Sequence, residues 1–272
     1  MSTMAPPPVL LSTSTFFGRP ISWTFDLAAR CGFEGVEVMV TKEPQSQDPR
    51  RIRDLAEDRG LWVGALHAPC LLLTRRVWGT DPVATTERAI EAAAEAGIPV
   101  VVVHPPYRWQ RAFRRWLEVE LPSIEARTGI AVAVENMFPV RVGRRSVAFH
   151  SDHDLDELEG LPHVVLDTSH AAVAGHDPAD VLVRFGDRLR HVHLSDNAGR
   201  GWDSHLPPGE GVLDLEAFLG TLASRPYGGS VSLEVDLRPS AEDEGRLVER
   251  LAGMREWTTA ALDAGAVVRR RG

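Results

Sequence analysis

Six apolar runs in the sequence each end at a residue type that commonly binds metal ions. In chain order these residues are His67, His104, Glu135, Asp167, His193 and Glu234. The runs, such as LWVGAL before the first and IPVVVV before the second, are continuously apolar, which is typical of parallel strands buried on both faces. In a barrel of alternating strands and helices, reactive side chains project from the C-terminal ends of the strands. We therefore predict that the six residues form a ring of ligands at one mouth of a barrel.

Three further candidate ligands lie just beyond two of these strand ends. His170 follows Asp167 by three residues, and Asp203 and His205 are two apart, which places them on the same side of a locally extended segment. The nine residues supply five imidazoles and four carboxylates, a set that suits zinc, manganese or iron better than magnesium or calcium.

Charge and coordination number bear on how many ions this set could hold. Four carboxylates carry about −4, so one dication leaves the pocket near −2, and two or three bring it to neutral or positive. A single six-coordinate ion cannot use nine ligands. Either the chain binds up to three divalent ions, or some of the outer residues hydrogen-bond the substrate instead. These outer residues are His67, His104, Asp203 and His205.

Strand and helix signals alternate along the whole chain and would position these residues. Apolar runs at 9–13 and 33–40 raise the number of predicted strands to eight. Helical patterns lie between them, and the one at 81–97 has Asp81 as its cap, Pro82 in its first turn and Gly97 at its end. Eight such units predict an α/β fold that closes into a single (β/α)8 TIM barrel.

The domain boundaries follow from the same pattern. We assign residues 9–264 to the barrel, 1–8 to a disordered N-terminal arm and 265–272 to a basic C-terminal tail. The helical stretch 241–262 either closes the barrel or contacts a second subunit, so a homo-oligomer is one of two interpretations. A length of 272 residues with 43% hydrophobic content fits one barrel of roughly 250 residues.

Composition restricts the function classes. The net charge of −8 argues against a broad basic surface for nucleic acid and leaves a local one open. No segment approaches the roughly 20 apolar residues needed to cross a bilayer, and the N-terminal run lacks the features of a secretory signal, so we expect a cytoplasmic protein. Lys42 is the only lysine and lies in a loop, which disfavours Schiff-base chemistry. Cys31 and Cys70 form no disulfide framework, and Cys70 either packs in the core or lines the site.

Arginine and aromatic residues cluster in the loops expected at the barrel mouth. Arginine binds phosphate or carboxylate in a bidentate manner, and aromatic faces stack on sugar rings or bases. These loops therefore predict a small anionic, sugar-like substrate. The candidate substrate-binding residues are Arg75, Arg76, Trp78, Tyr107, Trp109, Arg141 and Arg200.

The segments FEGVEVM, HAP, VVVHPP, AVEN, LDTSH, HVHLSD, DSHLPPGEG and LEV resemble the xylose-isomerase-like barrel superfamily over about residues 9–236. In its isomerase and epimerase branch, the resemblance implies that Glu135, Asp167, His193 and Glu234 hold one divalent ion, often manganese. It also implies that Glu135 and Glu234 exchange a proton with the substrate carbon, which the bound metal acidifies.

In the endonuclease IV branch, the resemblance implies that all nine residues bind a trinuclear zinc cluster, which would activate a hydroxide for phosphodiester cleavage. Two features depart from that branch. Cys70 stands where those enzymes usually have a tyrosine, and the first strand lacks their glycine-rich, histidine-containing opening. We therefore expect a metal-dependent sugar or sugar-phosphate isomerase or epimerase, with a multinuclear-zinc phosphoester hydrolase as the alternative.

Overall fold

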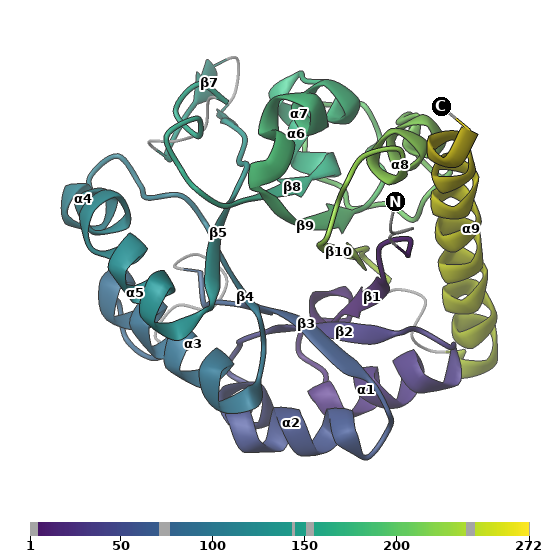
Figure 1. Cartoon of the computed structure of the whole chain (residues 1–272), viewed down its shortest axis with the longest axis horizontal. Coiled ribbons are helices and arrows are strands. Elements are labelled where there is room, and N and C mark those ends of the chain that lie inside the picture. The colour runs from purple at the N-terminus through teal and green to yellow at the C-terminus, as the bar shows by residue number, and fades with distance from the viewer. Residues whose placement is uncertain (1–4, 71–76, 143–144, 151–154, 238–242, 272) are drawn as a thin grey trace.

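Eight parallel strands form a closed barrel, as the sequence predicts (Figure 1). The computed structural model describes residues 5–70, 77–142, 145–150, 155–237 and 243–271. Strand β1 pairs with both β2 and β10, which closes the sheet. The barrel strands are β1 (Val9–Ser12), β2 (Gly35–Met39), β3 (Trp62–His67), β4 (Val100–Val103), β5 (Ala131–Glu135), β8 (Val164–Asp167), β9 (Leu189–Leu194) and β10 (Ser230–Leu233).

Helices surround the barrel on its outside (Figure 1). They are α1 (Ile21–Arg30), α2 (Pro49–Glu57), α3 (Pro82–Ala96), α4 (Arg111–Val119), α5 (Leu121–Thr128), α6 (Thr168–Ala174), α7 (Pro178–Phe185), α8 (Leu215–Ala223) and α9 (Glu244–Arg271). The predicted signals at the ends of α3 are confirmed. The Asp81 side chain accepts a hydrogen bond from the Val83 amide, and Gly97 ends the helix with a φ of 74°.

The two faces of the strands carry different side chains. Outward residues such as Leu66, Val101 and Leu166 are fully buried in the large hydrophobic cluster that also contains the helix side chains. Part of the barrel interior is filled by small apolar residues, among them Ala65, Ala133 and Val165, which form a separate cluster. Polar side chains, among them Glu37, His191 and His193, are also buried in the interior and lead to the mouth where the strands end.

Helix α9 extends further than the sequence indicates. Residues 265–271, which the sequence assigns to a basic tail, continue this helix to Arg271. Gly265 is buried, and a Cβ atom added there would lie 2.5 Å from the Gly220 carbonyl oxygen in α8. The absence of a side chain at Gly265 therefore lets the two helix backbones approach closely, and α9 packs against α8 of its own chain (Figure 1).

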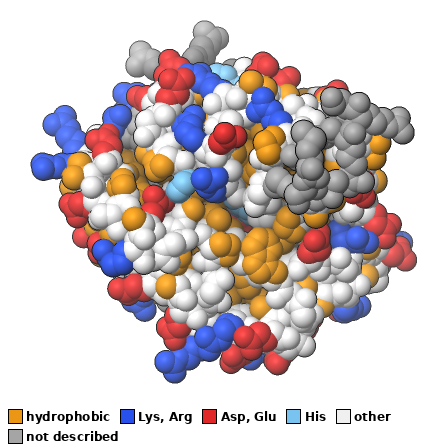
Figure 2. Space-filling model, viewed as in Figure 1, with side chains coloured by type: hydrophobic (Ala, Val, Ile, Leu, Met, Phe, Trp, Pro, Cys, Tyr) orange, Lys and Arg blue, Asp and Glu red, His pale blue; other side chains and the backbone are white. Residues whose placement is uncertain are grey.

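The loop after β5 holds a short hairpin that the sequence does not predict. Strands β6 (Val140–Val142) and β7 (Arg145–Val147) pair in antiparallel fashion outside the barrel. On the face seen in Figure 2, acidic and basic side chains alternate around the periphery, while hydrophobic side chains gather near the centre. Within the described part of the chain, every helix is too short or too polar to cross a membrane.

Candidate metal centre

The structure brings all nine predicted ligands together at the C-terminal mouth of the barrel. Three of them, His67, Glu135 and Asp167, are the last residues of β3, β5 and β8. His193 lies in β9, and His104 and Glu234 directly follow β4 and β10. His170 is in the first turn of α6, and Asp203 and His205 are in the loop after β9. Because parallel strands end at the same edge of a sheet, residues far apart in the chain meet here.

The loop that carries Asp203 and His205 is held in place by a buried carboxylate. Asp196 accepts hydrogen bonds from four backbone amides, those of Asn197, Gly209, Gly211 and Leu213, at 2.8–3.0 Å. A Cβ atom on Gly211 would lie 2.3 Å from an Asp196 oxygen, so only glycine fits there. His205 has a φ of 40°, so the segment is not regularly extended, yet its ring lies beside Asp203.

Glu135 is the central carboxylate of the site. Its Oε2 atom lies 3.5 Å from His67 Nε2 and 3.2 Å from His104 Nε2. Its Oε1 atom lies 3.0 Å from His193 Nδ1 and 3.3 Å from His170 Nδ1. The two oxygens thus face different histidines, an arrangement in which one carboxylate can bridge two cations.

Seven of the nine predicted ligands fall into three connected groups, each with its atoms within 4.8 Å of one another, and a fourth such group in the barrel interior contains Glu37, His191 and His193. The first group is His67, His104 and Glu135. The central group is Glu135, Asp167 and His193. The loop group is Asp167, His170 and His205. Glu135 is common to the first and central groups, and Asp167 to the central and loop groups.

The remaining two carboxylates complete these groups. Glu234 Oε2 lies 3.0 Å from His193 Nδ1, which adds it to the central group. Asp203 Oδ2 lies 2.9 Å from His205 Nε2 and 3.4 Å from His170 Nε2, which adds it to the loop group. Each of the nine predicted ligands therefore belongs to at least one group.

Three of the histidines are oriented by backbone carbonyls. Nδ1 of His67 lies 3.0 Å from the Ala68 oxygen, Nδ1 of His170 lies 3.0 Å from the Asn136 oxygen, and Nδ1 of His205 lies 2.8 Å from the Glu234 oxygen. When Nδ1–H donates to these oxygens, Nε2 carries a free lone pair. Metal-binding histidines are commonly fixed in this way.

The chemistry of the cluster fits divalent cations. Glu135 Oε2, Asp167 Oδ2 and Glu234 Oε2 are buried and accept no hydrogen bond from the described residues. A buried carboxylate oxygen without a partner is costly, and a cation would satisfy it. The mixture of imidazole nitrogen and carboxylate oxygen favours zinc or another transition metal.

The electrostatics of the cluster point the same way. Burial raises the pKa of Glu135, but His193 and His170 lower it more, so this pKa lies well below its usual value. Burial lowers the pKa of His205, but Asp167 and Asp203 raise it to about 10. The pKa of His193 is likewise well above its usual value, because Glu37, Glu234 and Glu135 outweigh its burial. The carboxylates thus attract positive charge strongly, and a divalent cation would replace the protons on the histidines.

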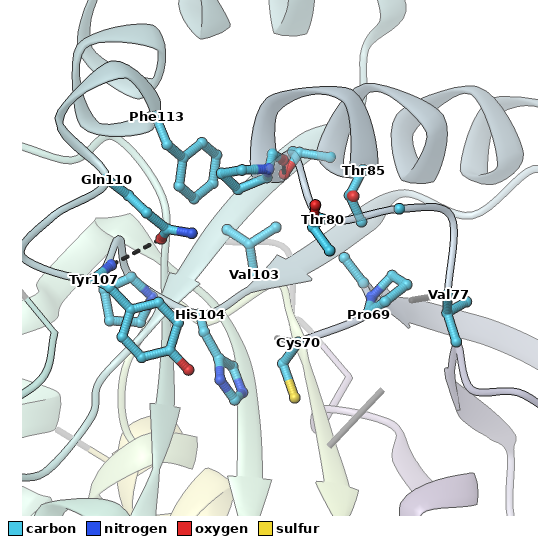
Figure 3. A pocket seen from close by; sticks show the side chains of 15 residues that line it. Pro69, Cys70, Val77, Thr80, Thr85, Val103, His104, Tyr107, Gln110 and Phe113 are labelled. Atoms are coloured by element: carbon cyan, nitrogen blue, oxygen red, sulfur yellow. Dashed lines mark hydrogen bonds between the residues drawn. The ribbon is translucent and has the colours of Figure 1, made fainter. Parts of the chain in front are cut away.

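Two predicted aromatic residues lie beside the metal centre in a stack of rings. Tyr107 stacks on Trp109 at 4.8 Å and on His150 at 4.5 Å between ring centroids, so both of its faces are covered. Its hydroxyl, the His104 ring and the Cys70 thiol point toward the same space, and Gln110 holds the Tyr107 amide (Figure 3). Tyr107 is therefore placed to meet a ligand with its hydroxyl edge, while Trp109, 63% exposed, ends the stack at the surface.

The other predicted substrate residues are distributed differently. Trp78 packs against the hydrophobic core, and the Arg88 guanidinium lies 4.9 Å from its ring centroid. Arg200 is exposed and lies 6.0 Å from the Trp202 ring, so neither Trp78 nor Arg200 lines the pocket above the ligands. The side chains of Arg75, Arg76 and Arg141 are outside the described residues.

The pocket above the ligands has a largely apolar wall. Besides ligand residues and Tyr107, its described lining is Met39, Cys70, Met137, Phe138 and His150. Phe138 packs on the ligand His170, with 4.8 Å between ring centroids. Lysine and arginine are absent from this described lining. The sequence leaves two roles open for Cys70, packing in the core or lining the site. Cys70 has both, because it is buried and also lines the pocket.

Two important residues were missed from the sequence. Asn136 accepts a hydrogen bond from the Asp167 amide at 2.7 Å and donates one to the Asp167 oxygen at 3.1 Å, which fixes the end of β8 beside β5. Glu37 is completely buried in β2, and its Oε1 lies 2.8 Å from His193 Nε2. The available signal for Glu37 was a charged residue inside the otherwise apolar segment VEVMV.

Comparison with known proteins finds a matching family model and relatives that are similar over most of the chain. A family model described as xylose isomerase-like TIM barrel matches residues 25–257. An uncharacterized protein of Mycobacterium leprae is 37% identical over 263 residues, which cover 89% of this chain and 94% of the relative.

Proteins of known structure that share this fold are named for different activities. A D-tagatose 3-epimerase-like protein superposes with a TM-score of 0.66 and 23% identity, covering 92% of this chain and 98% of the other. A family 2 AP endonuclease from Brucella melitensis gives a TM-score of 0.64 and 20% identity, covering 85% and 93%. The IolI protein, whose structure holds a zinc atom, gives a TM-score of 0.68 and 17% identity, covering 94% and 97%. At these identities the comparison shows a shared fold and does not show a shared reaction.

Proposed function

Because the chain belongs to the xylose isomerase-like TIM barrel family, whose members share a barrel but differ in reaction, we propose that it is a metal-dependent phosphoester hydrolase. The proposed site uses more than one divalent cation per chain. Zinc suits the ligands best, and manganese is the alternative.

The observation that carries this proposal is the division of nine ligands into three groups joined by Glu135 and Asp167. A one-metal enzyme would need four of these residues. The other five would then be free to face substrate, but three of them, His67, His170 and His205, instead direct Nε2 toward carboxylates and anchor Nδ1 on the backbone. This orientation supports a ligand role for them, which moves our preference from the isomerase expected from sequence to the hydrolase.

The chain's own residues would do three things in this reaction. Glu135 and Asp167 would fix the spacing between the groups, since each belongs to two of them. The carbonyl-anchored histidines would keep the site rigid, and the buried walls would limit the access of bulk water. When bound, divalent cations supply the charge that stabilises phosphoester cleavage and acidifies water.

The pocket also supports a class of substrate. The described lining residues include neither arginine nor lysine, and the phosphoryl oxygens would bind at the metal groups themselves. The organic part of the ester would lie against Met137, Phe138 and the Tyr107 edge, which favours a partly apolar alcohol group.

A second candidate function rests on the central group. Glu135 Oε1 and Glu234 Oε2 each lie 3.0 Å from His193 Nδ1, so two carboxylates flank the position where a single ion would sit. Such a pair could remove and return a proton on a sugar or sugar-phosphate substrate. This is the isomerase or epimerase activity expected from the sequence resemblance.

The two functions are separated by assaying metal-loaded and metal-stripped protein with two probes. One probe is bis(p-nitrophenyl) phosphate, and the other is a set of ketoses and ketose phosphates in deuterated water. We expect release of p-nitrophenol that is lost on stripping and restored by zinc or manganese. Deuterium incorporation into a ketose, without phosphoester cleavage, would overturn the hydrolase in favour of the isomerase.

A further inference from the structure

We propose that Glu37 is a positioning residue that selects which nitrogen of His193 binds metal. Glu37 lies on β2, outside the three groups at the mouth of the barrel, and it is completely buried, in a fourth close group with His191 and the predicted ligand His193. The inference rests on the metal-dependent function proposed above. It applies equally to the hydrolase and to the isomerase, because His193 belongs to the central group in both.

The contacts of His193 divide between its two ring nitrogens. Nε2 lies 2.8 Å from Glu37 Oε1, whereas Nδ1 lies 3.0 Å from both Glu135 and Glu234. Glu37 can only accept, so when a cation in the central group replaces the proton on Nδ1, Glu37 would keep the remaining proton on Nε2 and leave Nδ1 to bind the cation. This is the carboxylate–histidine–metal arrangement that orients ligands in metal sites. His193 therefore uses the opposite nitrogen from His67, His170 and His205.

A second histidine lies close to the other oxygen of Glu37. His191 Nε2 lies 3.4 Å from Glu37 Oε2, and His191 Nδ1 lies 2.8 Å from Ser230 Oγ. The Tyr227 hydroxyl donates a hydrogen bond to the Ser230 carbonyl oxygen, so the chain of contacts continues into the loop before β10. Glu37 therefore lies between the two histidines in the barrel interior, hydrogen-bonded to His193 and in ion-pair contact with His191.

The alternation of side chains along β2 directs the Glu37 carboxylate into the barrel interior, where its burial costs free energy. In β2 the side chains alternate between the outer core and the barrel interior, and Val36 and Val38 face the outer core while Glu37 faces inward. A buried carboxylate is expensive unless it is paired. Here it is paired with the predicted ligand His193 and with His191, so its negative charge would also stabilise a cation bound in the central group.

The test is the metal affinity of the folded protein, measured by competition with a chelator after the metals have been removed. In Glu37→Met, which loses both oxygens, we expect the ion of the central group to bind about 10–100-fold more weakly. In Glu37→Gln, the amide oxygen can still accept a hydrogen bond from Nε2–H, so the loss of metal affinity should be smaller than in the methionine variant. Ions of the other two groups should bind as in the wild type.

Ser232→Ala is the matched control, because Ser232 is buried and is the register partner of His193 on the neighbouring strand β10. Its Oγ has no hydrogen-bond partner among the described residues, so its removal should leave metal affinity unchanged. Circular dichroism establishes that each variant is folded, and Glu37→Gln is the variant that best preserves volume. Wild-type affinity in folded Glu37→Met and Glu37→Gln proteins, or an equal loss in Ser232→Ala, would overturn the positioning role. If wild-type protein bound no divalent ion, the proposed function itself would fail instead.

Discussion

Replacing Glu135 by glutamine is expected to lower metal-dependent phosphoesterase activity by roughly 10⁴-fold, the order found when one member of a group that acts as a unit is removed. The reason is the position of this carboxylate between two ligand groups. Its oxygens lie 3.0–3.5 Å from four histidines, and an amide would keep the shape while losing the charge and one acceptor. The measurement is kcat/KM for bis(p-nitrophenyl) phosphate with saturating zinc.

Glu118→Gln provides the control for charge loss, because Glu118 is an exposed residue of α4 whose side chain is 56% accessible. This variant should retain wild-type activity. A Glu135→Gln protein that is folded and within tenfold of wild type would show that Glu135 does not join the groups. The hydrolase proposal would then lose its central residue.

Replacing His170 by asparagine is expected to remove about one bound ion per chain and to reduce phosphoesterase activity by roughly 10²–10³-fold. His170 belongs to the loop group only, where its Nε2 lies 3.4 Å from Asp203 Oδ2. Asparagine cannot extend a donor atom to the same position, so the loop group would lose a nitrogen ligand while the first and central groups keep theirs. Metal content after desalting, together with kcat/KM, provides the measurement.

The same substitution separates the two candidate functions. If the protein works with one ion held by the central group, His170→Asn should retain its metal and show only a weaker hold on substrate. His176→Asn is the matched control, since His176 lies just beyond α6 and is exposed. Unchanged metal content in His170→Asn with strongly raised KM for a ketose would favour the isomerase.

The fold, and the meeting of six of the nine predicted ligands at one mouth, could be predicted because both depend on strand ends. Buried parallel strands leave long apolar runs in the sequence, and the first polar residue after each run marks the mouth of the barrel. His67, Glu135 and Asp167 follow this rule, and each is the last residue of its strand. The position of these residues at the ends of apolar runs was enough to predict that they meet, without any knowledge of side-chain packing.

Other features depend on packing that a linear pattern does not contain. Glu37 lies within a strand, and its importance appears only when β2 and β9 face each other across the barrel interior. Tyr107 has the residue type expected for stacking on a substrate, but its faces are taken by Trp109 and His150, the latter about forty residues away. Residues 265–271 look like a charged tail, yet they continue α9, where Gly265 lies against the backbone of α8.

The central claim is that Glu135 and Asp167 join three metal-binding groups in one site. The most direct test is elemental analysis of the purified wild-type chain, with no metal added, to obtain the identity and number of ions per chain. We predict close to three ions per chain, with zinc as the main element. A reproducible value close to one, unchanged after incubation with excess zinc and desalting, would contradict it and leave the outer histidines and Asp203 to contact substrate.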